Sequence, residues 1–283
     1  MAQAVAIDGS GRIVAAGWAV NPVGYDEVFA LARYKSDGSL DTTFDNDGQV
    51  TTNILPYPNW QGSRERLGAI AIDPLGRLVV AGRLGQDYGH IAHSSAFVVL
   101  RYKATGSLDT SFNGGAGIAA PLFNGNNRDD AASAVAIDDQ GRIVVAGKAW
   151  SGASDHFALA RLHHDGTPDH SFDGDGKVIT SFGPCPSEAK AVMFDNSGKL
   201  LAAGLVTGTC VSGFAMARYN VDGSLDNTFT GGNYNGLATT DFSCSGSQTE
   251  EGARAIAIQY SHPYGGVPRI ILAGFTTGDS CRP

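Results

Sequence analysis

The segment AVAIDDQGRIVVAGKAW, residues 134–150, decides the fold because the chain repeats it. Related segments begin at Ala4, Ala69, Ala191 and Ala255. They divide the chain into four full units and one partial unit, at 4–68, 69–133, 134–190, 191–254 and 255–283. Self-similarity at such a period is typical of repeat architectures, in which stacked copies bury one another. We therefore expect a single repeat domain over 1–283.

Each full unit contains four segments with the composition of β-strands. In the third unit they are 134–138, 142–147, 157–161 and 176–181. The turn DQGR joins the first two, and Asp and Gly tolerate the positive φ of a tight hairpin. The first three segments are apolar on both alternating faces, whereas a sheet with one face in water alternates apolar and polar residues. The pattern predicts an all-β fold, a β-propeller of four-stranded antiparallel blades with about four and a half repeats.

Three motifs of the repeat resemble those of a known family. They are A-[VI]-A-I-D-x-x-G-[RK]-[IL], F-A-L-A-R-Y and D-G-S-L-D-x-[ST]-F-x-x-x-G, and they cover nearly the whole chain. The middle motif stands at 29–34, 97–102, 157–162 and 214–219, with Leu162 in place of its tyrosine. In these motifs the chain resembles the delta-60 repeat family of bacterial surface and secreted proteins. The resemblance implies a β-propeller and no particular biochemical activity.

The partial unit, 255–283, supplies only two of the four strands. Two arrangements follow, a five-bladed ring with an incomplete last blade or an arc of a larger ring or array. We expect the arc, because nothing in 255–283 provides the third and fourth strands.

The net charge of −8 at pH 7 limits the classes of partner. Nucleic-acid-binding proteins neutralise phosphates with clustered Lys and Arg, and no basic stripe is present, so we expect no nucleic-acid partner. No apolar run approaches the roughly 18 residues of a membrane-spanning helix, so we expect no membrane insertion.

The connections from the second to the third strand, and from the fourth strand to the next unit, lie on one face of a propeller. We call it the loop face, and it carries most of the variation between units. The candidate ligand-binding residues on it are Tyr57, Trp60, Arg64, Tyr88, His90, Trp150 and His156. Aromatic rings with nearby polar groups suit recognition of protein or carbohydrate. The alternative is that these loops are spacers whose aromatic side chains pack onto the blade ends.

All four cysteines lie in the last two units, at Cys185, Cys210, Cys244 and Cys281. Each pair flanks a predicted two-stranded hairpin, whose first and last residues are neighbours within reach of a disulfide. We predict the disulfides Cys185–Cys210 and Cys244–Cys281. Disulfides persist in oxidising compartments, so we expect a secreted, periplasmic or cell-surface protein. A zinc site is the alternative, but C-x-x-C spacing is absent.

An arginine ends the third strand of every full unit, and an aspartate follows eight residues later. The pairs are Arg33 and Asp41, Arg101 and Asp109, Arg161 and Asp169, and Arg218 and Asp226. A catalytic pair is needed once, whereas a structural pair is needed in every blade. We interpret them as ion pairs that hold the loop between the third and fourth strands.

The segments DNDG at 45–48 and DGDG at 173–176 resemble calcium loops, in which carboxylates at alternate positions bind the ion. Thr43 and Ser171 occupy the first ligand position, however, and no glutamate closes either loop. We expect no cofactor, with calcium as the weaker alternative.

These patterns favour a non-catalytic, exported interaction or scaffold module. A glycan-active hydrolase or lyase built on a propeller is one alternative, and a purely structural surface repeat is the other. The enzyme would need a unique acidic pair, for which Asp129 with Asp130, or Glu188, are the candidates.

Overall fold

The computed structural model describes residues 1–20, 27–54, 63–86, 94–121, 123, 129–208, 213–229, 235–242, 251–260 and 268–276. Two compact units divide the chain. The first contains Met1–Val145 and Arg161–Asp169, and the second contains Ala146–Ala160 and His170–Pro283. The described elements are β-strands and a short 3-10 helix, η1 at Phe112–Gly115.

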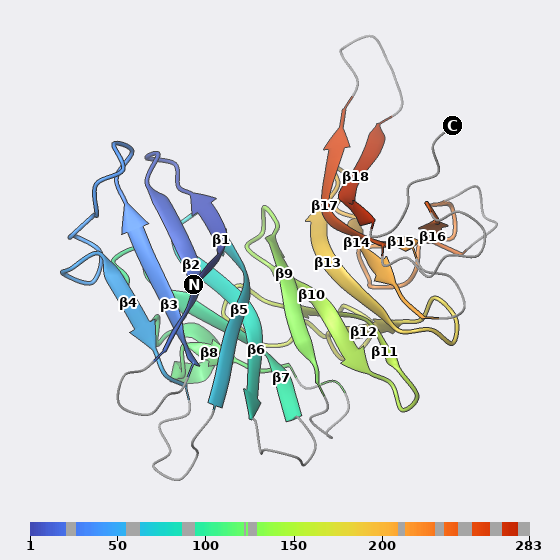
Figure 1. Cartoon of the computed structure of the whole chain (residues 1–283), viewed down its shortest axis with the longest axis horizontal. Helices are drawn as coiled ribbons and strands as arrows, with labels where there is room; N and C mark the ends of the chain where they lie inside the picture. The colour runs from blue at the N-terminus through green and yellow to red at the C-terminus, as the bar shows by residue number, and fades with distance from the viewer. Residues whose placement is uncertain are drawn as a thin grey trace. The chain divides into compact units, whose positions relative to one another are not determined.

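The first two repeats each form four strands in chain order. The strands are β1 (Ala2–Ile7), β2 (Ile13–Val20), β3 (Glu27–Tyr34) and β4 (Gln49–Thr52), then β5 (Ser63–Ile72), β6 (Leu78–Gln86), β7 (Ser94–Tyr102) and β8 (Ile118–Ala119). Neighbours within each repeat are antiparallel, as the arrows of β5, β6 and β7 show in Figure 1. One parallel pair, Glu27 with Arg64, joins β3 to β5.

The later repeats follow the same plan. The third has β9 (Ala131–Ile137), β10 (Ile143–Trp150), β11 (Asp155–Leu162) and β12 (Lys177–Thr180), and the fourth has β13 (Ser187–Phe194), β14 (Leu200–Val206), β15 (Gly213–Tyr219) and β16 (Leu237–Thr240). The partial unit forms a hairpin of β17 (Glu251–Gln259) and β18 (Arg269–Thr276). The predicted all-β fold with four-stranded antiparallel sheets is thus confirmed.

The Asp/Gly turns between the first two strands explain the repeated motif. In the second repeat, Oδ1 of Asp73 accepts hydrogen bonds from the backbone N–H groups of Leu75 and Arg77, at 2.9 and 2.8 Å. Gly76 has a φ of +76°, which glycine adopts without steric cost. Side chain and glycine together fix the hairpin, so the motif recurs wherever the hairpin does.

A glycine in the second strand faces a β-bulge in the first. The register of β5 and β6 shifts between Leu67 and Ala69, and Gly82 pairs with Leu67. A Cβ on Gly82 would lie 2.2 Å from the backbone oxygen of Arg66. Only glycine allows this close approach, which accounts for the repeated A-G at the same place in each unit.

The middle strands are buried on both faces, as their unbroken apolar runs predict. The residues with almost no exposed surface include Leu78, Val79, Val80 and Ala81 in β6, and Leu200, Leu201, Ala202 and Ala203 in β14. Burial on both faces is what stacked blades require. In the described residues, no helix is long and apolar enough to cross a membrane.

The first strand of each later repeat begins earlier than predicted. β5 begins at Ser63 rather than Ala69, and β9 begins at Ala131 rather than Ala134. The polar residues before the apolar motif are still paired in the sheet, because backbone pairing does not require apolar side chains. Arg64, which we expected in a loop, therefore lies in a strand.

Candidate functional site

The arginine that ends the third strand of the first repeat is buried against its own aspartate. Arg33 donates from Nε to Oδ2 of Asp41 over 2.7 Å, and both side chains are 4% exposed. The guanidinium carbon lies 4.6 Å from the ring centroid of Phe44, and Nη1 donates to the backbone carbonyl of Ala104 in the second repeat. We call the arginine, aspartate and phenylalanine of a repeat its clamp. A clamp is closed when the turn of the next repeat occupies it.

The second repeat has a closed clamp with the same dimensions. Arg101 Nε lies 2.7 Å from Asp109 Oδ2, and its guanidinium carbon lies 4.6 Å from the centroid of the Phe112 ring. Nη1 donates to the backbone carbonyl of His164 in the third repeat. Charge-assisted hydrogen bonds of this kind satisfy both buried partners, which makes the pair part of the packing between repeats.

A backbone hydrogen bond accompanies each contact between a clamp and the next turn. In the first three repeats the residue after the clamp phenylalanine donates its N–H to a carbonyl in the following repeat. The donors and acceptors are Asp45 and Thr105 at 2.7 Å, Asn113 and Asp165 at 2.6 Å, and Asp173 and Asp222 at 2.7 Å. In the third repeat the Nε of Arg161 again lies 2.7 Å from Oδ2 of Asp169.

Each clamp phenylalanine also packs against a glycine of the next turn. The glycines are Gly106 beside Phe44, Gly166 beside Phe112 and Gly223 beside Phe172. A Cβ on Gly166 would lie 2.7 Å from the ring of Phe112, and the φ of Gly166 is +91°. The position excludes a side chain for two reasons, backbone conformation and lack of space.

The fourth repeat exchanges the partners of its charged groups. In the first three repeats the arginine of the Asp/Gly turn pairs with the aspartate of that turn, in the pairs Arg12–Asp8, Arg77–Asp73 and Arg142–Asp138. Here Lys199 replaces that arginine, and its Nζ lies 2.8 Å from Oδ2 of Asp226. Nη2 of Arg218 turns to Oδ2 of Asp195, at 2.6 Å.

We call the fourth clamp open because its arginine is partly exposed and lies farther from its own aspartate than in the first three repeats. Nε of Arg218 lies 3.4 Å from Oδ2 of Asp226 and has no hydrogen-bond partner among the described residues. The Arg218 side chain is 26% exposed, whereas Phe229 is half-buried and its ring centroid lies 5.7 Å from the guanidinium. Phe44, the matching ring of the first repeat, is fully buried. The open clamp consists of Lys199, Arg218, Asp226 and Phe229.

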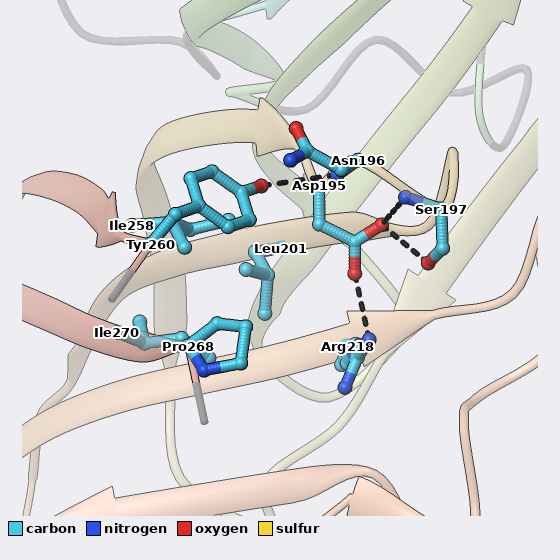
Figure 2. Close-up of a pocket in the computed structure, with 9 residues that line it drawn as sticks. All are labelled: Asp195, Asn196, Ser197, Leu201, Arg218, Ile258, Tyr260, Pro268 and Ile270. Atoms are coloured by element: carbon cyan, nitrogen blue, oxygen red, sulfur yellow. Dashed lines mark hydrogen bonds and ion pairs between the residues drawn. The ribbon is translucent and has the colours of Figure 1, made fainter. Parts of the chain in front are cut away.

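A pocket of about 320 Å³ lies beside the open clamp (Figure 2). Its lining residues are Asp195, Asn196, Ser197, Leu201, Arg218, Ile258, Tyr260, Pro268 and Ile270. Figure 2 shows Asp195 between Ser197 and Arg218, with Leu201 among the apolar side chains. Apolar walls with a few convergent polar groups are typical of ligand sites. The hydroxyl of Tyr260 accepts a hydrogen bond from the backbone N–H of Asn196 at 3.0 Å.

The acidic groups of the pocket and the open clamp are held in their charged form. Burial raises the pKa of Asp226, but hydrogen bonds from Lys199 and Thr228 outweigh it and lower that pKa to about 2. Burial likewise raises the pKa of Asp195, and hydrogen bonds from Ser197, Lys199 and Arg218 lower it below its usual value. The pocket therefore presents a guanidinium whose counter-charges stay ionised at neutral pH.

The structure describes only part of the predicted loop face. Tyr57, Trp60, Tyr88 and His90 lie outside the described residues, as does the side chain of Arg64. Trp150 ends β10 and is half-buried. The four-residue connection that follows, 151–154, is shorter than the predicted loop of 149–156.

His156 is buried, which corrects the expectation of an exposed loop residue. It lies in β11 and is 6% exposed. Its Nε2 lies 3.2 Å from Oγ of Ser154, and its Nδ1 has no hydrogen-bond partner among the described residues. Burial lowers the pKa of His156, with a weaker opposing effect from Asp155. A Ser–His contact alone does not make a nucleophile, because no carboxylate orients Nδ1 in the described structure.

Cys185 is buried and disulfide-bonded. Its predicted partner, Cys210, lies outside the described residues, as do Cys244 and Cys281. The end of the β13–β14 hairpin does reach Cys185, because a Cβ on Gly208 would lie 3.4 Å from its Sγ. The pairing of Cys185 with Cys210 stays a prediction that this proximity supports.

In the acidic loops that resemble calcium sites, carboxylates accept hydrogen bonds from the backbone of their own turns. Asp47 Oδ1 accepts a hydrogen bond from the backbone of Gln49 at 2.8 Å, and Asp175 Oδ1 accepts one from Lys177 at 2.9 Å. Asp173 has a pKa raised by burial and by the charges of its acidic neighbours. No group of three metal-ligating side chains is found in the part of the chain that the structure describes.

Two of the candidate acids for a catalytic pair have contacts with neighbouring residues. The backbone N–H of Asp130 donates to the carbonyl of Ser95, whose hydroxyl donates to the carbonyl of Asp130, and Glu188 pairs with Lys190. Two buried carboxylates, Glu65 and Glu251, were not among the predicted site residues. Glu65 accepts the N–H of Ile54 and Glu251 that of Phe242, each at 2.8 Å. Both stand four residues before the repeat motif, so alignment of the units could have shown them.

Four segments match a protein-family model described as "Domain of unknown function (DUF5122) beta-propeller". They are residues 9–44, 76–112, 141–172 and 196–229. The chain is a β-propeller-type repeat protein. Each matched segment of this propeller runs from the Asp/Gly turn to the clamp phenylalanine, and in the first three repeats its end contacts the turn of the next repeat.

Several solved structures are similar to this propeller. A putative exo-beta-1,3-galactanase from Bifidobacterium bifidum s17 is 12% identical with a TM-score of 0.46, over 98% of this chain and 88% of that one. An endo-arabinase from Bacteroides thetaiotaomicron VPI-5482 is 10% identical with a TM-score of 0.41, over 99% and 96%. A protein of unknown function from Dyadobacter fermentans DSM 18053 is 13% identical with a TM-score of 0.44, and the alignment spans 79% of this chain and 62% of that one. No curated protein matches.

Proposed function

We propose that this propeller is a non-catalytic interaction module, exported from the cell, that binds protein or carbohydrate through its loop face. The observation that carries the proposal is the recurrence of the buried charges. Arg33, Arg101 and Arg161 each meet their aspartate at 2.7 Å. A catalytic pair is needed once, whereas these pairs serve the same packing role in successive repeats. The attraction within each pair offsets the free-energy cost of burying its two charges, which is a structural role rather than a catalytic one.

The loop face supports the binding part of the proposal through its aromatic residues. Trp150 ends a central strand and keeps part of its surface exposed, so a rigid sheet holds the ring in place. Such a ring offers contact area at a small cost in conformational entropy. Tyr57, Trp60, Tyr88 and His90 extend the same face in the sequence, and we assign them to it as predictions.

Export is supported by Cys185, which is disulfide-bonded. Structural disulfides are rare in reducing compartments. We assign the chain to the delta-60 repeat family because it carries the three repeat motifs described above. Mass spectrometry of non-reduced peptides is expected to recover a fragment that links Cys185 to Cys210. A link from Cys185 to Cys244 would contradict the assigned strand order.

A binding screen against glycans and surface proteins tests the loop face. Trp150→Ala is expected to reduce binding of any hit by about tenfold, the usual effect of removing a central aromatic contact. Val20→Ala is the matched control, because Val20 is exposed and ends the equivalent strand of the first repeat. Equal loss in both variants, or no loss in either, would remove the loop face from the proposal.

The proposal that the propeller has no catalytic activity is tested by a separate assay. The purified propeller is expected to release no reducing ends and no unsaturated products from a panel of bacterial, algal and plant polysaccharides. Release that disappears in Glu188→Gln or Asp130→Asn would instead support the glycan-active alternative. Those two variants change the candidate acids and leave the repeated clamps intact.

A further inference from the structure

Asparagine is followed by glycine at three places in the chain, at 113–114, 124–125 and 235–236. Because glycine has no side chain to shield its backbone nitrogen, that nitrogen can approach the asparagine side-chain amide and attack it. The reaction requires an asparagine side chain that can turn and a glycine N–H that no hydrogen bond holds. The structure describes the pairs at 113–114 and 235–236, and the two pairs differ in both requirements.

The asparagine side chains of the two described pairs have different surroundings. Asn113 is half-buried, its Nδ2 donates to the carbonyl of Ile118 at 2.8 Å, and its backbone N–H donates to the carbonyl of Asp165 at 2.6 Å. Asn235 is exposed, and its side chain makes no hydrogen bond in the part of the chain that the structure describes. The φ angles are nearly equal, +49° and +47°, so the side chains and not the backbone distinguish the two pairs.

The glycine nitrogen of the fourth repeat also differs from its counterparts. In the first three repeats the glycine before the fourth strand donates its N–H to the carbonyl of the clamp phenylalanine. The pairs are Gly48 and Phe44 at 2.6 Å, Gly117 and Phe112 at 3.0 Å, and Gly176 and Phe172 at 2.7 Å. Gly236 is the matching residue, because its carbonyl accepts the N–H of the clamp arginine, Arg218. Among the described residues the N–H of Gly236 makes no such hydrogen bond, so no bond to the clamp holds its nitrogen.

An aspartate at position 235 suits the turn in which it would form. Asp47 and Asp175 occupy the place of Asn235 in the first and third repeats. Each Oδ1 accepts the backbone N–H of the residue two positions later, from Gln49 at 2.8 Å and from Lys177 at 2.9 Å. A carboxylate at this position is therefore compatible with the fold of the repeat.

We propose that Asn235 is a site of spontaneous deamidation in the folded protein. The backbone nitrogen of Gly236 loses its proton and forms a bond to Cγ of Asn235, and the side-chain nitrogen leaves as ammonia after it takes up a proton. Water then opens the succinimide ring. Cleavage of the new C–N bond gives aspartate, and cleavage of the original peptide bond gives isoaspartate. No atom is oxidised or reduced, and water is the only co-reactant.

The attack takes place between adjacent residues, so the burial of Gly236 does not prevent it. Both products add a negative charge at 235, but only isoaspartate adds a methylene group to the backbone. The addition lies just before Gly236, whose carbonyl accepts the N–H of Arg218 at 2.9 Å and which precedes β16. We expect it to loosen the pairing of β16 with β15, so that hydrogen exchange in 237–240 is faster in the isoaspartate form.

Incubation of the 283-residue protein at neutral pH, followed by reduction, trypsin digestion and mass spectrometry, tests the site directly. The peptide 219–254 is expected to gain the mass of an amide-to-acid conversion. Electron-transfer fragmentation is expected to place the change at 235 and to separate aspartate from isoaspartate. Conversion at 235 is expected to be at least about tenfold faster than at 113, because the hydrogen bonds of Asn113 must break before it reacts.

Two controls separate the effect of the fold from that of the local sequence. In urea the two pairs are expected to convert at similar rates, because Asn113 then loses its hydrogen bonds. Asn235→Gln is expected to abolish the conversion at 235, because attack on the longer side chain forms a less favoured ring.

Three results would overturn the proposal. They are absence of conversion at 235 in the folded protein, equal rates at 113 and 235 in the folded protein, and a rate ratio that is the same in urea. Unchanged conversion of the peptide 219–254 in Asn235→Gln would assign the reaction to another asparagine and would overturn it as well. Trp150→Ala, on the loop face, is expected to leave the rate unchanged, so this proposal and the proposed binding function fail separately.

Discussion

The second and fourth repeats contain the same clamp residues in different states. Arg101 is almost fully buried and contacts Asp109, Phe112 and the next turn, whereas Arg218 is partly exposed, donates to Asp195 and keeps only a longer contact of 3.4 Å with Asp226. The local sequence is nearly the same in both. In the second repeat the turn of the next repeat contacts the clamp, and in the fourth a pocket lined partly by the β17–β18 hairpin lies beside Arg218. The same residue types therefore pair differently in the two repeats.

The largest effect is expected from truncation of the two arginines. Arg101→Ala leaves the buried carboxylate of Asp109 without its cation, which costs about 3 to 5 kcal/mol of unfolding free energy. Arg218→Ala leaves Asp226 paired with Lys199 and is expected to cost about 1 kcal/mol or less. Urea unfolding followed by circular dichroism measures both values. Similar losses in the two variants would mean that the fourth clamp is closed in solution.

Substitution of a turn glycine tests the contact between a clamp and the next turn without changing any charge. Gly166→Ala places a Cβ against Phe112 at a φ of +91° and is expected to cost about 3 kcal/mol through overpacking and backbone strain. Gly38→Ala in the first repeat has a similar φ of +84° but no atom within 4 Å, so only the strain of about 1 kcal/mol remains. Thermal unfolding of the pair isolates the contact. Equal destabilisation would show that the ring yields to the added methyl group.

The architecture could be predicted from the sequence because it depends on repetition. Five copies of one hairpin motif, apolar on both faces, leave few folds other than stacked four-stranded sheets. The pairing of Arg33 with Asp41 also followed from spacing, because the residues recur together. The extra residues of β5 could not be predicted, since Ser63 and Arg64 carry no apolar pattern. Pairing of the backbone there depends on the neighbouring strand.

The open clamp could not be predicted in the same way. The sequence signal was the lysine at 199 in place of arginine, but it does not show by itself that Arg218 donates to Asp195. The exchange depends on distances between side chains from four places in the fourth repeat. On the loop face, the burial of His156 could not be predicted from its neighbours in sequence either. It follows from the short connection 151–154.

The smallest expected effect concerns acid stability of the fourth repeat. The pKa of Asp226 is about 2 in the folded protein and 3.8 in a model peptide, so the folded state favours the ionised form. Its contribution to stability is therefore complete above about pH 5 and is lost progressively as the pH falls toward 2. The difference in unfolding free energy between the protein and Asp226→Asn is expected to shrink over this range by about 1 kcal/mol, because solvent screens the interaction of the carboxylate with the partly exposed Lys199.

Lys199→Met tells whether the exchanged partner causes this behaviour. Without the ammonium group, the folded-state pKa of Asp226 is expected to rise, so the stability lost on acidification is smaller and the loss is complete at a higher pH. The corresponding change in the second repeat, Arg77→Met, removes a cation that pairs with Asp73 and not with the clamp aspartate. It is expected to leave the titration of Asp109 unchanged, and NMR titration of the two carboxylates compares them directly. A shift of Asp109 in Arg77→Met equal to that of Asp226 in Lys199→Met would mean that the turn cation acts on the clamp in every repeat, and the exchange would then not be particular to the fourth.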